Sequence, residues 1–284
     1  MRLVDSSKVE WRRDAGNVRG GGGLDFKRLL AGRPGTPENY RLNLNKTVGD
    51  FETPRHRHNF DQVRIVLEGD MRISPQQIVK EGQVGYFPEG TYYGPYDDSG
   101  GHRISMIVQF GGASGNGFMS EEEAIAAKSE LLKEGTFKGG VFFRTAGTGK
   151  PNQDAFEAVW ERAIGKVVYP RPRYDFPIVA DPRSFDWKAT GQNGVSYKLL
   201  GNFTERATRL ECVRLEPGAS WTSPQENALL LLFVLRGAGS CNDEPYSKHT
   251  AIEIEAGETA KFRAADETEI FSLVMPLLRL RKAA

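Results

Sequence analysis

The sequence is poor in several residue types, and each shortage excludes a class of protein. Only two cysteines occur in 284 residues, Cys212 and Cys241, which is too few for a disulfide framework. The N-terminal residues are too polar for a signal peptide, and no apolar run reaches the roughly 18 residues that a membrane-spanning helix needs. We therefore expect a cytoplasmic protein with buried thiols and no membrane partner.

An excess of charge of either sign is also lacking. The chain has 38 basic and 37 acidic residues, well mixed along its length, and its net charge is +1. Proteins that bind nucleic acids or anionic membranes concentrate basic residues, so neither partner is expected here. The partner that remains is a small-molecule substrate.

Glycine and short β-like runs are what the sequence has in quantity. It contains 32 glycines and 15 prolines, and its length suits two domains. Helical patterns occur only after the capping box formed by Ser120 and Glu123, and from about Asp154 to Ile164. A mainly all-β protein with a short two-helix segment is therefore expected.

One stretch, Thr53 to Gly69, concentrates the residues with chemistry. His56 and His58 lie two positions apart, and Gln62 follows four positions later. The run Val63 to Leu67 is β-branched and apolar, which predicts a strand. Side chains at even spacing on a strand share a face, so His56, His58 and Gln62 are expected to converge. Two imidazoles and an amide oxygen make half of a metal site.

This stretch resembles the first motif of the cupin family, which reads His-x-His, three or four residues, Glu, six residues and Gly. The series His56, His58, Gln62 and Gly69 has that spacing, with glutamine in place of glutamate. The second cupin motif, Gly-x5-Pro-x-Gly-x2-His, is similar to Gly82–Tyr93, where tyrosine replaces the histidine. The resemblance implies the cupin fold, a double-sheet jelly roll.

The second half of the chain repeats the first. Phe233 to Gly237 is similar to Ile65 to Gly69, and Gly194 to Gly201 is similar to Gly23 to Leu30. Such a diverged duplication predicts tandem double-stranded β-helix barrels, the arrangement of a bicupin. The expected organisation is an N-terminal arm (1–25), a first cupin domain (26–113), a helical and extended linker (114–194) and a second cupin domain (195–284).

The second copy has lost the motif histidines. Aligning Gly237 with Gly69, and Gly257 with Gly82, puts other residues at the positions of His56, His58, Gln62 and Tyr93, namely Pro224, Glu226, Leu230 and Thr268. The strand Leu229 to Leu235 is apolar at every position, as in a strand that is buried on both faces. The second domain is therefore expected to be degenerate, with a packed interior and a structural or dimerising role.

For the first copy, the resemblance implies one divalent transition metal, with Fe(II) favoured and Mn, Ni or Zn open. His56 and His58 match the motif as ligands, and the alternative is a vestigial site with hydrogen-bonded imidazoles. Gln62 either ligates through its neutral amide oxygen or forms hydrogen bonds beside the metal. His102 shares the parity of the apolar set in Ile104–Phe110, which is expected to face the interior, so it either completes the site or stops at a loop edge.

Two further residues are candidates for contact with a substrate. Tyr93 is a candidate ligand, catalytic acid or base and substrate-binding residue, and the alternative is an aromatic ring that packs in the core. Arg64 has the parity of His58 and Gln62, so it is expected to point into the barrel, where a guanidinium needs a partner. Three alternatives are open for Arg64: a salt bridge with an acidic neighbour, an outward orientation at a bulge, or a hydrogen-bonded clamp for a substrate carboxylate.

The first hypothesis for the function is a metal-dependent bicupin enzyme, above all a dioxygenase-type oxidoreductase that acts on a small oxygenated organic substrate. Similar folds also carry lyases and isomerases, and a cupin without turnover can bind sugars or other small molecules. The altered residues Gln62 and Tyr93 agree with this second hypothesis, and the metal content of purified protein discriminates between the two. The expected arm and the exposed jelly-roll sheets favour a homodimer.

Overall fold

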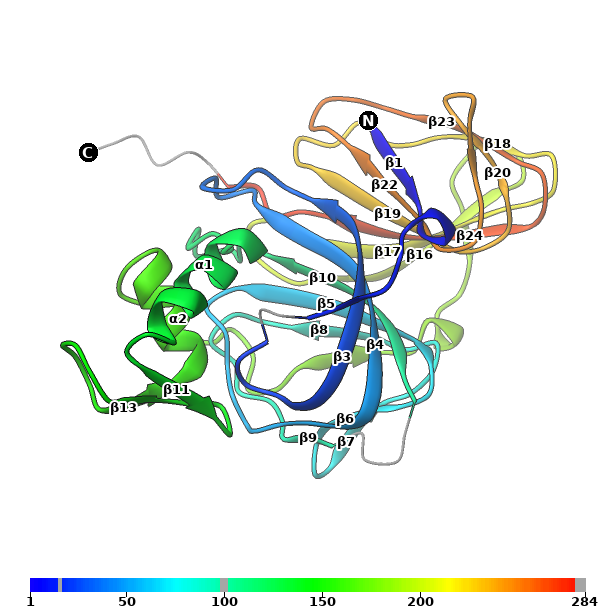
Figure 1. Ribbon diagram of the computed structural model, residues 1–284. Coiled ribbons are helices and arrows are strands. Elements are labelled where there is room, and N and C mark those ends of the chain that lie inside the picture. The colour runs from blue at the N-terminus through cyan, green and yellow to red at the C-terminus, as the bar shows by residue number, and fades with distance from the viewer. Residues whose placement is uncertain (15–16, 98–101, 279–284) are drawn as a thin grey trace. The chain divides into compact units, whose positions relative to one another are not determined.

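The computed structural model describes residues 1–14, 17–97 and 102–278, and the chain is mainly β-structure, as the sequence predicts (Figure 1). Two α-helices occur in this part of the chain, α1 (Glu121–Leu131) and α2 (Ala155–Ala163). Neither is long and apolar enough to cross a membrane.

The chain divides into two compact units. Unit 1 contains residues 1–10, 28–30 and 180–284, and unit 2 contains residues 11–27 and 31–179. This division differs from the expected one, because the first 25 residues do not form a single arm. Strand β1 (Arg2–Asp5) pairs with β22 (Thr250–Ile254) in unit 1, whereas residues from Gly21 onward already belong to the long strand β3 (Gly21–Ala31).

Unit 2 is built on one eight-stranded sheet. The motif strand, β5 (Asp61–Glu68), lies between β8 (Val84–Phe87) and β10 (Ile104–Phe110), and β10 pairs on its other side with β4 (Tyr40–Thr53) (Figure 1). The other strands of this sheet are β2 (Arg12–Arg13), β3, β14 (Ile178–Ala180) and β9 (Tyr96–Asp97), which pairs with β4. A separate hairpin is formed by β6 (Met71–Ser74) and β7 (Gln77–Val79).

The register of β5, β10 and β4 places polar side chains in rows on one face of the sheet. These cross-strand rows are Gln62–Gln109–Arg41 and Arg64–Ile107–Asn43. Directly opposed residues point to the same side of a sheet, so each row lies on one face. Residues of both rows line a cavity. The alternating apolar residues, such as Met106 and Val108, are buried on the opposite face. The expectation that the apolar set of β10 faces the interior of the barrel is therefore wrong.

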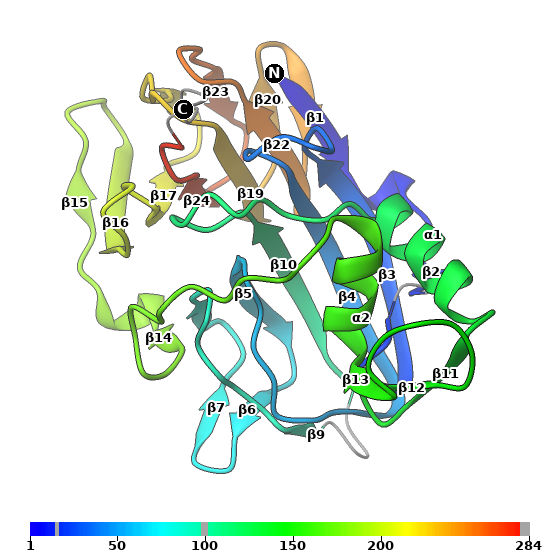
Figure 2. The same cartoon turned by 90° about the vertical axis from the view of Figure 1, so that its left-hand side faces the viewer.

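Residues 114–194 do not form a separate linker, since residues 114–179 belong to unit 2 and the rest to unit 1. Helices α1 and α2 pack side by side and form one buried apolar cluster with Phe60 and other side chains of unit 2 (Figure 2). The strands β11 (Gly135–Lys138), β12 (Val141–Arg144) and β13 (Asn152–Asp154) form a small sheet beside them. The predicted capping box of α1 is confirmed, because the side chains of Ser120 and Glu123 each accept from the other residue's backbone N–H.

Unit 1 is the second barrel, and its interior is packed with apolar side chains, as the sequence predicts. One sheet holds β1 and β22 with β15 (Lys188–Ala189), β16 (Val195–Asn202), β17 (Arg209–Leu215), β19 (Leu230–Arg236) and β24 (Thr268–Val274). The other holds β18 (Ser220–Thr222), β20 (Gly239–Cys241), β21 (Glu244–Tyr246) and β23 (Lys261–Ala264).

The backbone contacts correct one part of the alignment between the two copies. In unit 2, Gly90 N donates to His58 O, and in unit 1 the corresponding bond runs from Gly257 N to Glu226 O. Gly257 therefore takes the place of Gly90 rather than that of Gly82. Counting three residues onward puts Ala260, which is fully buried, at the position of Tyr93. Thr268 begins β24 instead, so it is not the counterpart of Tyr93.

Candidate functional site

His56, His58 and Arg64 line a cavity of about 200 Å³ in unit 2, and Gln62 and Tyr93 lie directly behind them without lining it. His56 and His58 lie between β4 and β5, and Gln62 and Arg64 follow on β5. Tyr93 is held beside His56 by backbone pairing, in which His56 N donates to Tyr93 O at 2.9 Å and Tyr93 N donates to His56 O at 3.0 Å. The ring centroids of His56 and His58 are 5.0 Å apart. The structure thus brings these five side chains together.

The ring of His56 has a defined orientation. Its Nδ1 lies 2.6 Å from Pro54 O, and since a carbonyl only accepts, the proton of the neutral ring is on Nδ1. The lone pair of Nε2 is left for the cavity, which the ring lines. Burial, followed by the positive charges of Arg19 and Arg64, lowers the pKa of His56 to about 3. A neutral imidazole whose far nitrogen donates to a carbonyl is the usual state of a metal-ligating histidine.

Gln62 joins His58 and Tyr93 in a compact hydrogen-bonded group. Arg64 Nη2 lies 2.8 Å from the Gln62 atom Oε1, which must be the oxygen because a guanidinium only donates. Gln109 Nε2 donates to the same oxygen at 3.1 Å. The amide nitrogen of Gln62 is thereby turned the other way, where it lies 2.8 Å from His58 Nδ1 and 2.5 Å from the Tyr93 hydroxyl.

The two histidines fit a metal ion as a pair, and the other expected ligands do not. Within the described part of the chain, Nε2 of His56 and Nε2 of His58 have no hydrogen-bond partner, and both rings line the cavity. Gln62 turns its amide nitrogen, rather than its oxygen, toward His58. Burial raises the pKa of the Tyr93 hydroxyl, so this group stays protonated. The described residues include no group of three His, Cys, Asp or Glu side chains that could hold a metal.

His102 is not part of this group. Its side chain is half exposed, and its Nε2 lies 3.5 Å from the carboxylate of Glu68. Glu68 ends β5, whereas Gln62 stands near its start, roughly 20 Å away along an extended strand. The structure therefore does not assemble a three-histidine site, because parity predicts the face of a strand but not the end at which a residue lies. Arg103, the next residue, lines the cavity instead.

Arg64 points into the barrel, as its parity predicts, but it lacks the expected salt bridge. The residue is 8% exposed and lines the cavity, and Phe87 and Tyr96 flank its guanidinium at 4.9 and 5.1 Å from the ring centroids. Besides the bond to Gln62, it makes only a long contact of 3.6 Å from Nη1 to the sulfur of Met71. Among the described residues, its Nε has no hydrogen-bond partner and no carboxylate pairs with its guanidinium. A buried charge in this state is unfavourable until a counter-charge arrives.

Sequence reasoning missed other polar side chains of the cavity. Arg19 and Arg41 line it, and so does Asn43, which is 4% exposed and whose Oδ1 has no hydrogen-bond partner within the part of the chain that the structure describes. Arg19 is paired with Asp154 at 2.6 Å, so its charge is compensated. The alternation of polar and apolar residues in β4 places Arg41 and Asn43 on one face of the strand. This pattern would have identified both as cavity residues if the polar face had been known to be the inner one.

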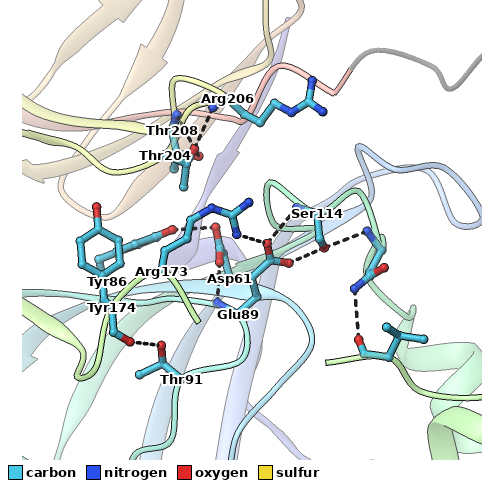
Figure 3. A network of polar contacts seen from close by, with 12 residues as sticks. Asp61, Tyr86, Glu89, Thr91, Ser114, Arg173, Tyr174, Thr204, Arg206 and Thr208 are labelled. Carbon is cyan, nitrogen blue, oxygen red and sulfur yellow. Dashed lines mark hydrogen bonds and ion pairs between the residues drawn. The ribbon is translucent and has the colours of Figure 1, made fainter. Parts of the chain in front are cut away.

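A second buried polar group lies in unit 2, apart from the residues that line the cavity (Figure 3). The carboxylates of Asp61 and Glu89 are 0% and 1% exposed. Asp61 accepts from Glu89 N at 2.7 Å and from the Tyr86 hydroxyl at 2.8 Å, and Glu89 accepts from Arg173 at 2.7 Å and from Ser114. This group fastens the segment around Arg173 to the turn after β8.

The same group predicts a pH dependence of stability. Burial, and then the charge of Glu89, raises the pKa of Asp61 to about 7, against about 4 in an unfolded chain. Between these values the folded protein holds a proton that the unfolded chain releases, so the free energy of unfolding should fall as the pH rises from about 4 to about 7, and level off above. Urea unfolding at several pH values should show this slope, and Asp61→Asn should reduce it. An equal slope in both proteins would contradict the assignment.

No protein-family model and no curated protein matches the sequence. Solved structures match it over nearly the whole chain. A candidate dioxygenase from Nostoc punctiforme has a TM-score of 0.65 at 12% identity, with 99% of this chain and 84% of that chain covered. Oxalate decarboxylase of Bacillus subtilis, which has Mn(II) centres, has a TM-score of 0.57 at 14% identity, with 99% and 78% covered.

A bacterial pirin from Escherichia coli, in complex with nickel(II), has a TM-score of 0.56 at 11% identity, and the match covers 98% of this chain and 99% of that chain. Identities this low show a shared fold and nothing finer. The chain therefore has the two-barrel cupin fold that its motifs predict.

Proposed function

We propose that the first barrel binds a small organic anion, and that with a divalent transition metal on His56 and His58 it is a dioxygenase-type oxidoreductase. The observation that carries the proposal is the state of Arg64, a buried guanidinium that lines the cavity and has no carboxylate partner among the described residues. An anionic ligand would supply the missing counter-charge and accept from the unused N–H of Nε.

The size of the cavity limits the ligand. A cavity of roughly 150 Å³ holds a benzene ring, so the volume of about 200 Å³ here suits a ring or short chain with one or two polar groups. Arg64 would bind its anionic group, and the free oxygen of Asn43, across Ile107 in the same row, would accept from a hydroxyl or an amine. Small hydroxy acids and hydroxylated aromatic acids have these features.

A metal on His56 and His58 would supply Lewis acidity and, with iron or manganese, a redox centre for reaction with O₂. The protein around it would bind and orient the anion through Arg64, and Tyr93 would support His58 from behind as a neutral hydroxyl. The structural neighbours agree with this proposal, since they include a candidate dioxygenase, a manganese enzyme whose substrate is a small dicarboxylate, and a nickel complex.

A binding protein without turnover is the second candidate. The observation that favours it is the direct contact of Gln62 and Tyr93 with His58, at 2.8 and 2.5 Å, which leaves the two histidines without a third protein ligand among the described residues. In this version the cavity would hold the same class of anion with no metal present.

The metal content of untagged protein, purified without chelator and measured by plasma mass spectrometry, separates the two candidates. Near-stoichiometric metal that is absent from a His56→Ala/His58→Ala variant is the result expected for the enzyme, and oxygen uptake with hydroxylated aromatic acids would then follow. A wild-type protein that contains no metal and takes none up on reconstitution would contradict the enzyme. Calorimetry with small carboxylates would then test the binding protein alone.

A further inference from the structure

The amide of Gln62 on β5 is fixed by a chain of hydrogen-bond donors that begins two strands away, at Arg41 on β4. Arg41 Nη2 donates to Gln109 Oε1 at 2.6 Å, and Gln109 Nε2 donates to Gln62 Oε1 at 3.1 Å. Arg64 adds a second donor to the same oxygen at 2.8 Å. Turning the amide of Gln62 over would put its NH₂ group against two donors, so the orientation is determined by the neighbours.

This orientation decides where the proton of His58 is. The NH₂ group of Gln62 has two hydrogens, and its two near neighbours are the Tyr93 oxygen at 2.5 Å and His58 Nδ1 at 2.8 Å. The Tyr93 hydroxyl is itself 2.5 Å from His58 Nδ1. A ring nitrogen that faces an NH₂ group is an acceptor, and an imidazole with one accepting nitrogen is neutral and has its single proton on the other.

We propose that Gln62 is a positioning residue that keeps the proton of His58 on Nε2, so that the metal-free barrel offers an N–H to an organic anion and disfavours a metal ion. A metal needs the lone pair of Nε2, so the proton must move to Nδ1, where it would face the NH₂ group of Gln62. In the cupin motif that this stretch resembles, glutamate stands here, and a carboxylate would accept from Nδ1–H and leave Nε2 free.

The inference rests on the proposed function, since it concerns the same two histidines. His56 and His58 then present opposite groups to the cavity, a lone pair on His56 Nε2 and an N–H on His58 Nε2. Together with the guanidinium of Arg64, the cavity has donors suited to a carboxylate, and the lone pair of His56 joins the free oxygen of Asn43 as an acceptor suited to a hydroxyl group. Glutamine in place of glutamate thereby changes the binding preference of the site from cations to anions.

The test is ¹⁵N NMR of metal-free protein labelled at histidine, with the His58 signals assigned by a His58→Ala variant. Wild-type protein should show the proton of His58 on Nε2. Gln62→Glu should move it to Nδ1, because a carboxylate oxygen then faces that nitrogen. Asn45→Asp is the matched control. Asn45 lines the same cavity from β4, and the variant adds the same charge at a residue that contacts neither Gln62 nor His58 among the described residues, so the proton should stay on Nε2.

Titration with Ni²⁺ alone completes the test. Gln62→Glu should bind Ni²⁺ at least ten times more tightly than Asn45→Asp, because the added charge is equal and only the first variant frees the lone pair. A proton on Nδ1 in the wild type, or the same tautomer in all three proteins, would overturn the inference. If the proton moves as expected but none of the proteins binds Ni²⁺, the role of Gln62 is supported and the metal part of the proposed function fails.

Discussion

An Arg64→Met variant is expected to lose affinity for small carboxylates by about 30-fold or more, and to unfold at a higher temperature when no ligand is present. The loss of affinity follows because a buried charge that pairs with a ligand is worth about 2–5 kcal/mol on truncation. The gain in stability follows because Arg64 is 8% exposed with no carboxylate partner among the described residues, so methionine removes an uncompensated charge from the interior. Few single substitutions are expected to act in opposite directions on stability and on binding.

Isothermal titration with a series of small carboxylates, and calorimetric unfolding of the ligand-free proteins, would measure both effects. Arg41→Met is the matched control, because Arg41 lines the same cavity but hydrogen-bonds to Gln109 at 2.6 Å and lies 3.8 Å from the carboxylate of Glu121. This control should lower the unfolding temperature rather than raise it. Unchanged affinity in Arg64→Met would show that the guanidinium does not bind the ligand.

Leu232→Arg is expected to prevent stable folding of unit 1, with a loss of more than about 4 kcal/mol. The alignment of the two copies, with Glu226 at the place of His58, puts Leu232 at the place of Arg64. Leu232 is fully buried in a closely packed apolar cluster. An arginine there would meet neither a cavity nor a polar row, so its charge would be buried without partners.

Urea unfolding followed by the fluorescence of Trp221, which lies in the same cluster, would report the effect. Leu232→Met should change the stability by less than about 1.5 kcal/mol, since the volume is similar and no polar group is added. A soluble Leu232→Arg protein with wild-type stability would mean that the interior of this barrel is open to solvent, in contrast to its packing.

The sequence also predicted several local features that the structure confirms. The β-branched run after Gln62 forms β5, and the capping box at Ser120 begins α1. Asp154 accepts from the first backbone N–H groups of α2, where the second helix was expected. These features depend on neighbours in the chain, such as caps, turns and the period of two in a strand, so they can be derived without a tertiary structure.

The motif spacing and the internal repeat were enough to predict the two-barrel fold, the convergence of His56, His58 and Gln62, and the apolar interior of the second barrel. The tertiary structure decided which face of β10 lines the cavity, because a period of two separates the faces without saying which is inside. It also decided that His102 stands at the far end of β5, beside Glu68. The direction of the Gln62 amide depended on Arg64 and Gln109, whose donors come from across the sheet and cannot be read from spacing along one strand.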